Sequence, residues 1–335
     1  MLDINGEGLR LMKDSLSIIV PCYNEEEMIS IFFNEVEAMR LPFKYEYIFV
    51  DDGSSDTTLK EIKQVYEQAM DKVRFISFSR NFGKEAGIYA GLKASRGDYI
   101  VLMDVDLQDP PELLPKMYQL LMEETDLDCV GTRRTTRHGE PPIRSLFAKS
   151  FYKIMDAISE TEIVDGARDY RMMTRAMVDS ILELTEYNRF SKGIFSWVGY
   201  NTKYLEFENR ERVKGETTWS FWGLFKYSID GIISFSTVPL TVVSFIGMAI
   251  FLISIVLAII FAIRTLVFAN PVEGWTSLVV IILGLGGIQT FALGVIGQYL
   301  GKAFLETKKR PIFIAKETEE DYKEKVENGV NSYGI

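Results

Sequence analysis

Short apolar runs alternate with amphipathic segments between residues 17 and 130. Apolar runs of this length predict buried strands, and apolar side chains along one helical face predict surface helices. Their alternation predicts an α/β fold with a Rossmann-like, mostly parallel sheet. The expected strands are residues 17–20, 45–50, 73–78 and 98–103, and the expected helices are residues 25–39, 57–70, 85–94 and one that opens at Pro110 and Pro111.

The pattern is less regular between residues 131 and 215, where we expect mixed helices and a few antiparallel strands. Residues 1–215 are therefore expected to form one domain. Residues 216–236 that follow are rich in aromatic and aliphatic side chains, with Lys226 and Asp230 among them. This composition predicts an amphipathic helix in a membrane interface, and a helix packed on the domain is the alternative.

Two long runs without a charged side chain come next, at residues 231–263 and 274–301. A helix of roughly 20 apolar residues spans a bilayer core. Buried core helices are the alternative, but soluble proteins seldom contain such long uncharged helices. We therefore expect two transmembrane helices within residues 237–305, joined by a short outer turn.

The charges around these runs predict the topology. The first 15 residues are charged and contain no long apolar stretch, so we expect no signal peptide and a cytoplasmic domain. Basic residues that follow the second run favour two cytoplasmic termini in a multi-pass protein of the cell membrane. Residues 306–335 are expected to form a charged tail, poorly ordered towards Ile335. The basic residues are Lys302, Lys308, Lys309 and Arg310.

The composition disfavours several other kinds of chemistry. The net charge of −10 argues against a nucleic-acid partner. His138 is the single histidine, which is too few for a His-rich metal site. The G-x-x-x-x-G-K-[ST] and G-x-G-x-x-G loops of ATPases and dehydrogenases are absent. Cys22 and Cys129 are expected to be buried thiols, and the spacing of Gly297 and Gly301 favours helix packing, within the chain or between subunits of a homo-oligomer.

Polar residues follow three of the expected strands. In an open parallel sheet, ligands bind outside the carboxyl ends of the strands. Helix capping explains one acidic strand end, but not three on strands that should be neighbours. Asp104, Asp106 and Gln108 offer oxygen ligands that suit Mg²⁺ or Mn²⁺ bound also to a substrate phosphate. The three polar clusters are residues 21–25, 51–54 and 104–106.

Residues 131–153 reverse the acidic character of the chain, with six basic residues and one acid. A solvated surface is one interpretation, and a patch that binds an anionic ligand or phospholipid is the other. The basic residues are Arg133, Arg134, Arg137, Arg144, Lys149 and Lys153.

Four motifs together resemble the inverting family-2 glycosyltransferases. The nearest branch is the polyprenyl-phosphate glycosyltransferases, which includes bactoprenol glucosyltransferases and is similar to dolichol-phosphate mannose synthase. The resemblance covers roughly residues 15–315, including both apolar runs. The motifs are residues 20–25 (VPCYNE), 50–56 (VDDGSSD), 79–84 (SRNFGK) and 104–112 (DVDLQDPPE).

The resemblance implies a GT-A fold, a nucleotide-diphosphate sugar donor and a polyprenyl phosphate acceptor. It implies that Asp106 and Gln108, with Asp104, hold Mg²⁺ or Mn²⁺. It implies acceptor-phosphate contacts by Arg133 and Arg144, and an essential carboxylate at Asp169, so the expected catalytic residues are Asp104, Asp106, Asp169 and Arg133. The residues expected to bind the nucleotide sugar are Pro21, Tyr23, Glu25, Asp52, Lys84, Asp104 and Arg212.

The sequence departs from the family pattern at Thr218, where the family commonly has a lysine after Gly-Glu-Ser. One cationic donor contact is therefore missing, and Lys214 is a candidate substitute. The implied reaction joins two anions, and the second pKa of a phosphate monoester is about 6, so the acceptor is already a nucleophile at neutral pH. We therefore expect Asp169 to orient an arginine or the sugar, rather than to act as a base.

Attack opposite the leaving group would invert the anomeric centre. Glucose carried by UDP is the expected donor group, and the lipid-linked sugar would serve cell-envelope glycosylation. A processive polysaccharide synthase is an alternative, although two membrane helices are few for a translocation channel. A catalytically silent sugar-binding membrane scaffold is the other alternative, and the complete set of carboxylates argues against it.

Overall fold

The computed structural model describes residues 12–134, 164, 166–208, 229, 232–234, 236–268 and 274–328. The strands within these residues are β1 (Met12–Cys22), β2 (Phe43–Asp51), β3 (Val73–Phe78), β4 (Tyr99–Leu102), β5 (Cys129–Arg134), β6 (Ala167–Thr174), β7 (Thr202–Phe207) and β8 (Ala315–Thr318). The helices are α1 (Ile29–Ala38), α2 (Thr58–Gln68), α3 (Lys84–Ala94), the 3₁₀ turn η1 (Pro111–Leu113), α4 (Leu114–Glu123), α6 (Arg175–Glu183), α7 (Ser191–Trp197), α9 (Val238–Phe268), α10 (Trp275–Thr307) and α11 (Glu319–Glu327).

The strands form one sheet in the order β7-β5-β6-β4-β1-β2-β3-β8. The central strands β4, β1, β2 and β3 are parallel. β6 lies antiparallel between β4 and β5, β7 is parallel to β5, and β8 is antiparallel to β3. The expectation of a mostly parallel α/β sheet with a few antiparallel strands is therefore confirmed.

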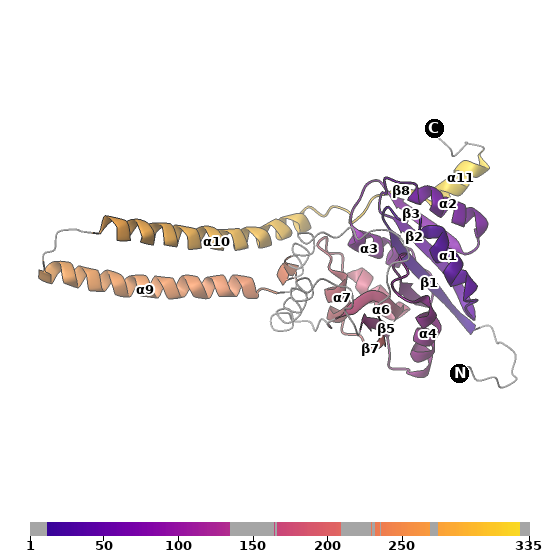
Figure 1. Ribbon diagram of the computed structural model, residues 1–335, viewed down its shortest axis with the longest axis horizontal. Helices are drawn as coiled ribbons and strands as arrows, with labels where there is room; N and C mark the ends of the chain where they lie inside the picture. Colours follow the sequence, from indigo (N-terminus) through magenta and orange to yellow (C-terminus); the bar gives the residue numbers. More distant parts are fainter. Residues whose placement is uncertain are drawn as a thin grey trace.

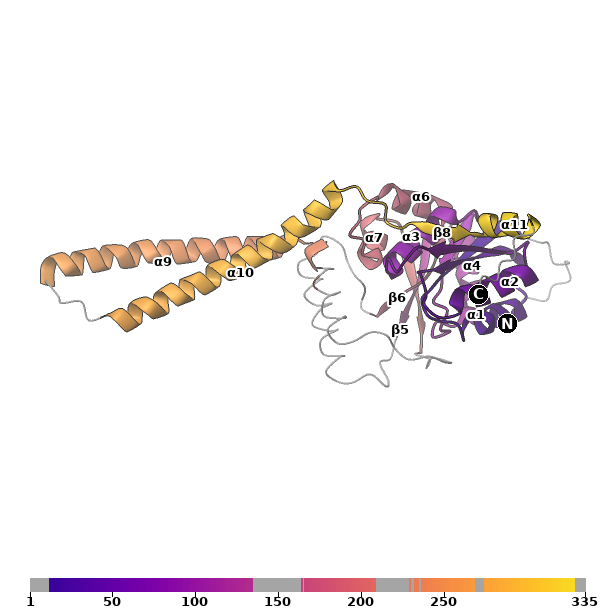
Figure 2. The ribbon, with the colours of Figure 1, turned by 90° about the horizontal axis from the view of Figure 1, so that it is seen from above.

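Helices cover both faces of this sheet (Figures 1 and 2). Successive residues of a strand point to opposite faces, and β1 shows the consequence. Ile18 packs into the core under α1, α2 and α4, whereas Ile19 packs into the core under α3, α6 and α7. This burial on both faces explains why β1 reads as a continuous apolar run.

The element boundaries differ from the expected ones mainly at their ends. β3 has the bounds expected for it, and β1 extends beyond residues 17–20 in both directions. The helix expected from residue 25 begins at Ile29. Asn24 has a φ of 53°, and residues 26–28 form a turn before the helix. The polar segment after β1 is therefore a loop at the carboxyl edge of the sheet.

The expected tail at 306–335 differs most from the structure. The charged composition predicted a tail poorly ordered towards Ile335, but residues 315–327 form β8 and α11 on the edge of the sheet, and residues 329–335 lie outside the described residues. Phe313 stacks on Phe78, with ring centroids 4.9 Å apart. Glu317 accepts hydrogen bonds from Lys63 and Lys325, at 2.6 and 2.9 Å. Acidic residues of this segment thus form ion pairs with basic residues of the domain, and composition alone does not show such pairs.

Tyr322 of α11 supplies the main buried contact of this C-terminal segment. Its ring is 3% exposed and packs edge-on against Tyr66 and Phe75. We expect Tyr322→Ala to lower the free energy of unfolding by about 3 kcal/mol, because it removes a large buried ring. Thermal unfolding of the purified protein measures this effect. Val326→Ala on the same helix, at a site 49% exposed, should change stability by less than about 0.5 kcal/mol; equal melting temperatures for the two variants would contradict the prediction.

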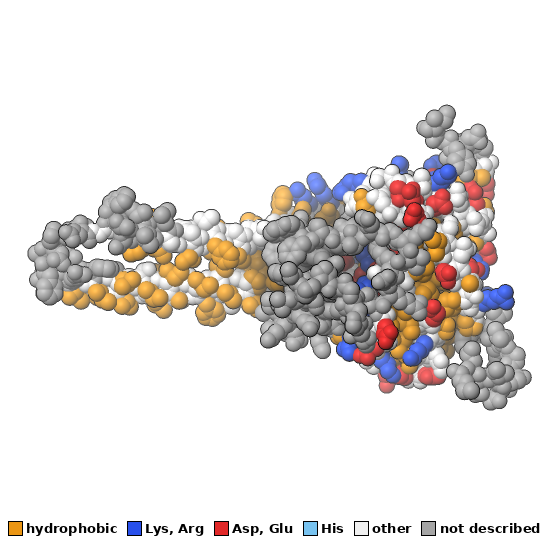
Figure 3. All heavy atoms as spheres, viewed as in Figure 1, with side chains coloured by type: hydrophobic (Ala, Val, Ile, Leu, Met, Phe, Trp, Pro, Cys, Tyr) orange, Lys and Arg blue, Asp and Glu red, His pale blue; other side chains and the backbone are white. Residues whose placement is uncertain are grey.

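α9 and α10 project away from one end of the domain as two long helices (Figure 1). Their surfaces carry many exposed hydrophobic side chains, which Figure 3 shows along the helix pair, whereas charged side chains gather on the domain. Within the described residues, Val238–Leu257 is the one segment long and apolar enough to cross a membrane, judged by length and composition. The expected interfacial helix at 216–236 lies almost entirely outside the described residues.

Candidate active site

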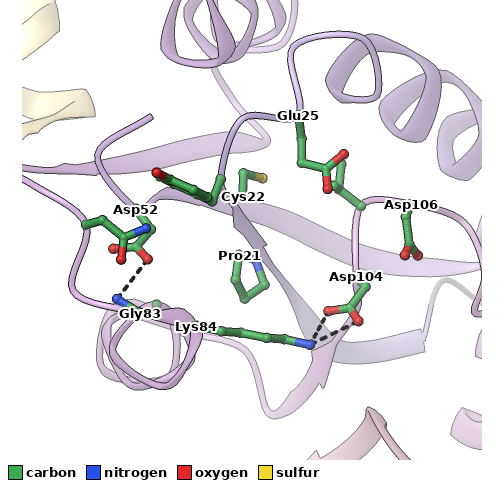
Figure 4. Close-up of a pocket in the computed structure, with 12 residues that line it drawn as sticks. Pro21, Cys22, Glu25, Asp52, Gly83, Lys84, Asp104 and Asp106 are labelled. Atoms are coloured by element: carbon green, nitrogen blue, oxygen red, sulfur yellow. Dashed lines mark hydrogen bonds and ion pairs between the residues drawn. The ribbon is translucent and has the colours of Figure 1, made fainter. Parts of the chain in front are cut away.

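The carboxyl ends of β4, β1 and β2 meet at one edge of the sheet, as expected from three polar strand ends on neighbouring strands. They enclose a cavity of about 230 Å³. Seven of the residues expected at the site line it, so the structure brings most of the expected donor site together (Figure 4). The lining residues are Pro21, Cys22, Tyr23, Glu25, Asp52, Asn81, Gly83, Lys84, Gly87, Asp104, Val105 and Asp106.

The two aspartates at the end of β2 have different roles. Asp51 is buried, and its carboxylate accepts hydrogen bonds from the Ser77 hydroxyl at 2.7 Å and from the Ser54 N–H at 3.0 Å. Gly53 follows with a φ of 65°, and a Cβ there would lie 2.4 Å from the carbonyl carbon of Arg80. Asp51 and Gly53 therefore shape the turn, which leaves Asp52 to face the cavity.

Asp52 holds the loop that leads into α3. Its two carboxylate oxygens accept the N–H groups of Phe82 at 2.6 Å and of Gly83 at 2.9 Å. Burial raises the pKa of Asp52, and these two N–H groups offset part of the effect. Gly83 has a φ of 97°, which suits glycine. The loop therefore places Lys84, the first residue of α3, at the floor of the cavity in Figure 4.

Lys84 joins the two parts of the expected catalytic site. Its Nζ lies 2.7 Å from Asp104 Oδ1 and 2.7 Å from Asp169 Oδ2. Burial would lower the pKa of Lys84, but the two carboxylates outweigh it and raise this pKa. Burial would raise the pKa of Asp169, but Lys84, Lys192 and Arg171 outweigh it and lower this pKa. Both Lys84 and Asp169 are therefore charged at neutral pH.

A buried ion pair lies behind Asp104. Arg168 Nε donates to Asp109 Oδ1 at 2.9 Å, and Arg168 Nη2 lies 3.9 Å from Asp104 Oδ2. Asp109 is fully buried, and its Oδ2 accepts no hydrogen bond within the described residues. Burial raises the pKa of Asp109, although Arg168 opposes this. Asp104 thus has two cations near its carboxylate, Lys84 and Arg168, a feature that the one-residue spacing of Asp104 and Asp106 did not reveal.

Asp106 and Gln108 lie on the turn after β4. Asp106 Oδ1 accepts the Gln108 N–H at 3.1 Å, and Gln108 Oε1 accepts a hydrogen bond from Arg134 at 3.2 Å. Within the described residues no three His, Cys, Asp or Glu side chains form a ready-made metal cluster. Mg²⁺ is commonly held by one or two carboxylates together with substrate phosphates, and Asp104 and Asp106, which both line the cavity, offer carboxylates of this kind.

Of the two arginines expected to contact the acceptor phosphate, the structure describes Arg133 but not Arg144. Arg133 on β5 is 42% exposed along its side chain, forms an ion pair with Glu206 of β7, and does not line the cavity. Its neighbour Arg134 instead reaches Gln108. Arg144 and Arg212 lie outside the described residues, as does Thr218.

Some residues in or beside the cavity were not predicted. Asn81 and Gly87 line the cavity, and Glu85 accepts hydrogen bonds from the Ser191 N–H and hydroxyl. Burial raises the pKa of Glu85, although its bonds with Ser191 oppose this. Asn81 lies inside the 79–84 motif, so the motif contained a signal for it; the Glu85 contact spans 106 residues, and no local pattern indicates it.

A mostly parallel α/β sheet, with an Asp-x-Asp turn at its carboxyl edge, is typical of glycosyltransferases of the GT-A type. The chain belongs to glycosyltransferase family 2: the family model "Glycosyl transferase family 2" matches residues 17–182, and full-length relatives agree. The expectation that the chain is a family-2 glycosyltransferase is therefore confirmed.

Three relatives show how far the similarity extends. The chain is 40% identical over 303 residues to the bactoprenol glucosyl transferase of Shigella phage SfX, covering 90% of this chain and 98% of that protein. It is 39% identical over 308 residues to the uncharacterized glycosyltransferase sll0501 of Synechocystis sp., covering 91% and 96%. It is 38% identical over 303 residues to the prophage bactoprenol glucosyl transferase homolog of Escherichia coli K12, covering 90% and 98%. Because 90–91% of the chain is aligned, the similarity extends beyond the α/β domain into the region of α9 and α10.

Among solved structures, glucosyl-3-phosphoglycerate synthase from Mycobacterium tuberculosis, in complex with Mn²⁺ and UDP-glucose, matches with a TM-score of 0.43 and 19% identity. The match covers 66% of this chain and 77% of that one. A likeness this distant says nothing about what this chain binds.

Proposed function

We propose that the protein transfers glucose from UDP-glucose to a polyprenyl phosphate, such as undecaprenyl phosphate, at the cytoplasmic side of a membrane. One observation carries the proposal: Lys84 joins Asp104, which lines the cavity, to Asp169 beyond it. The ammonium of Lys84 therefore connects the expected donor site, through Asp104, to Asp169, the carboxylate that the family resemblance implies to be essential. Relatives that are 38–40% identical along 98% of their length are named as bactoprenol glucosyl transferases, which supports this lipid acceptor.

The donor half of the site consists mainly of residues that line the cavity. Pro21, Tyr23, Glu25 and Asp52 would contact the base and ribose. Asp104 and Asp106, assisted by Gln108, would hold Mg²⁺ or Mn²⁺. When bound, the ion stabilises negative charge on the leaving diphosphate. Arg212 is a further proposed contact to the diphosphate.

The acceptor half has to accommodate a second anion. A phosphate monoester is mostly dianionic at neutral pH and needs little help from a base. Lys84, at 2.7 Å, keeps the carboxylate of Asp169 ionised. Asp169 in turn orients the ammonium of Lys84 beside the reacting groups. Arg133 and Arg144 would offset the acceptor charge. Attack opposite the leaving diphosphate would give a β-linked sugar from an α-linked donor.

The helix pair would keep this site near the lipid. α9 and α10 contain 31 and 33 residues, and each exceeds the roughly 20 that a bilayer core requires. We propose that both helices span the membrane. The basic residues after α10 favour a cytoplasmic catalytic domain. A lipid phosphate could then reach the domain from the side, without leaving the bilayer.

The proposed reaction is tested by supplying purified protein in liposomes with undecaprenyl phosphate, Mg²⁺ or Mn²⁺, and one nucleotide sugar at a time. The panel is UDP-glucose, UDP-GlcNAc, UDP-galactose and GDP-mannose, and mass spectrometry identifies the lipid. We expect a single glucose on the lipid. Another sugar would correct the donor, and a polymer would indicate a processive synthase. Donor binding without turnover on any of the four would overturn the proposal in favour of a silent scaffold.

Removing the divalent ion is expected to abolish transfer. EDTA should reduce the rate by at least about 100-fold, since the leaving diphosphate then lacks its main charge partner. Added Mg²⁺ or Mn²⁺ should restore the rate. Calorimetry of Mn²⁺ binding in the presence of UDP gives a second readout, which Asp106→Asn should weaken. Full activity in EDTA would show that side chains alone stabilise the leaving group.

A further inference from the structure

The last turns of α10 form a junction between the membrane helices and the catalytic domain. Tyr299 donates its hydroxyl to the Ser236 carbonyl at 2.6 Å, and Lys302 Nζ lies 2.9 Å from Ser234 Oγ. Both contacts tie α10 to the segment that leads into α9. One turn later, Glu306 faces the catalytic domain instead. The end of α10 therefore contacts both halves of the molecule.

Glu306 holds the loop between α6 and α7. Its carboxylate accepts the Tyr187 N–H at 3.0 Å, the Asn188 N–H at 3.0 Å and the Asn188 side-chain amide at 2.9 Å. The same amide lies 3.4 Å from the Lys302 carbonyl. Two successive backbone N–H groups and one side-chain amide thus donate to the carboxylate of Glu306. Hydrogen bonds to a charged group are stronger than those between neutral groups, so this contact holds the loop firmly.

The other end of this loop reaches the active site. Arg189 is 9% exposed, and its guanidinium lies 4.6 Å from the centre of the Tyr89 ring on α3. Ser191 donates its N–H to Glu85 at 2.9 Å. Glu85 directly follows Lys84, whose ammonium joins Asp104 and Asp169. A short run of chain, 187–191, thus contacts α10 at one end and the first turn of α3 at the other.

We propose that Glu306 is a positioning residue, which sets the catalytic site at the distance from the membrane that a lipid-linked phosphate requires. The inference rests on the proposed function. A soluble acceptor can diffuse to the site in any orientation, but a phosphate anchored by its lipid reaches only a limited distance from the bilayer. Reaction with the anchored acceptor therefore depends on how rigidly α10 holds the domain. A loose junction lowers the fraction of time that the site lies within reach of the lipid phosphate.

The alternative is that Glu306 only stabilises the fold. Glu306 is exposed, so its truncation leaves no core cavity, and the domain retains its second attachment through β8 and α11. A stabilising role would affect every acceptor equally. A positioning role affects the membrane-bound acceptor selectively, and this difference separates the two.

The test compares two acceptors in the same proteoliposomes, undecaprenyl phosphate in the bilayer and a short, water-soluble prenyl phosphate. We expect Glu306→Ala to lower kcat/KM for the undecaprenyl acceptor by about tenfold, the effect of losing hydrogen bonds to one charged group. The rate with the soluble acceptor and the KM for the donor should stay within about twofold. Glu306→Gln, which retains an acceptor oxygen, should recover part of the rate.

Glu324→Ala, at an exposed site on α11, is the matched control and should leave both rates unchanged. Equal losses with both acceptors, or no loss with either, would overturn the positioning role. Melting temperatures of all variants show whether a loss reflects unfolding. Wild-type protein that uses neither acceptor would refute the proposed function instead, so the two failures are distinct.

Discussion

Asp104→Asn is expected to lower the rate of sugar transfer by about a thousandfold. The side chain lines the cavity, and its carboxylate lies 2.7 Å from Lys84 Nζ and 3.9 Å from Arg168 Nη2. The substitution keeps the shape but removes the charge that would bind the metal. Loss of one preorganised electrostatic contact at a reacting centre costs about 10²- to 10³-fold, and here the loss would fall on both the ion and Lys84.

The measurement is the steady-state rate with undecaprenyl phosphate, together with calorimetry of Mn²⁺ and UDP. Asp98→Asn provides the matched control. Asp98 precedes the same strand at its opposite end, where its carboxylate accepts the Ser15 N–H at 2.9 Å, remote from the cavity. It should retain nearly full activity. If Asp104→Asn were as active as Asp98→Asn, Asp104 would have no part in donor or metal binding.

Lys84→Met is expected to lower the rate by about a hundredfold, and to introduce a new dependence on pH. Lys84 is the contact through which Asp104 and Asp169 share a counter-charge. Methionine preserves much of the volume but leaves two carboxylates close together without a cation. Lys84→Arg retains the charge and is the matched control, with a smaller loss expected.

The sign of the pH effect follows from the shifted groups. In the wild type the pKa of Asp169 is lowered and that of Lys84 is raised, so neither group changes charge near neutral pH. The titration of these two groups should therefore cause no change in the transfer rate near neutral pH. Without Lys84, the main cause that lowers the pKa of Asp169 is lost and that pKa rises, so activity should fall earlier as the pH decreases. An unchanged acidic limb in Lys84→Met would show that Asp169 is held ionised by other groups.

The C-terminal segment shows where composition misleads. Its charged residues predicted a tail poorly ordered towards Ile335, yet Glu319 lies 2.6 Å from Arg74 Nε, and Tyr322 is buried against β3. Charge density indicates disorder only when the charges have no partners and the segment has no apolar anchors. The partners Lys63 and Arg74, and the rings of Tyr66 and Phe75 that pack on Tyr322, lie more than 200 positions earlier in the chain.

The sequence by itself determined the strand-end site. Alternating strands and helices require a parallel sheet, and a parallel sheet brings the ends of neighbouring strands to one edge. Asp52, Asp104 and Asp106 therefore had to meet there, whatever the details of packing. The long uncharged runs likewise predicted two long apolar helices, and α9 and α10 are such helices.

Only the tertiary structure decided which charges meet across that edge. Lys84 and Asp169 are 85 positions apart, Asp109 and Arg168 are 59 apart, and Glu306 lies 119 positions beyond Tyr187. Such pairs depend on strand register and on the direction of each side chain, and a one-residue slip in a strand reverses the face to which a side chain points. Local patterns do not specify register between distant segments; the packing of the whole core does.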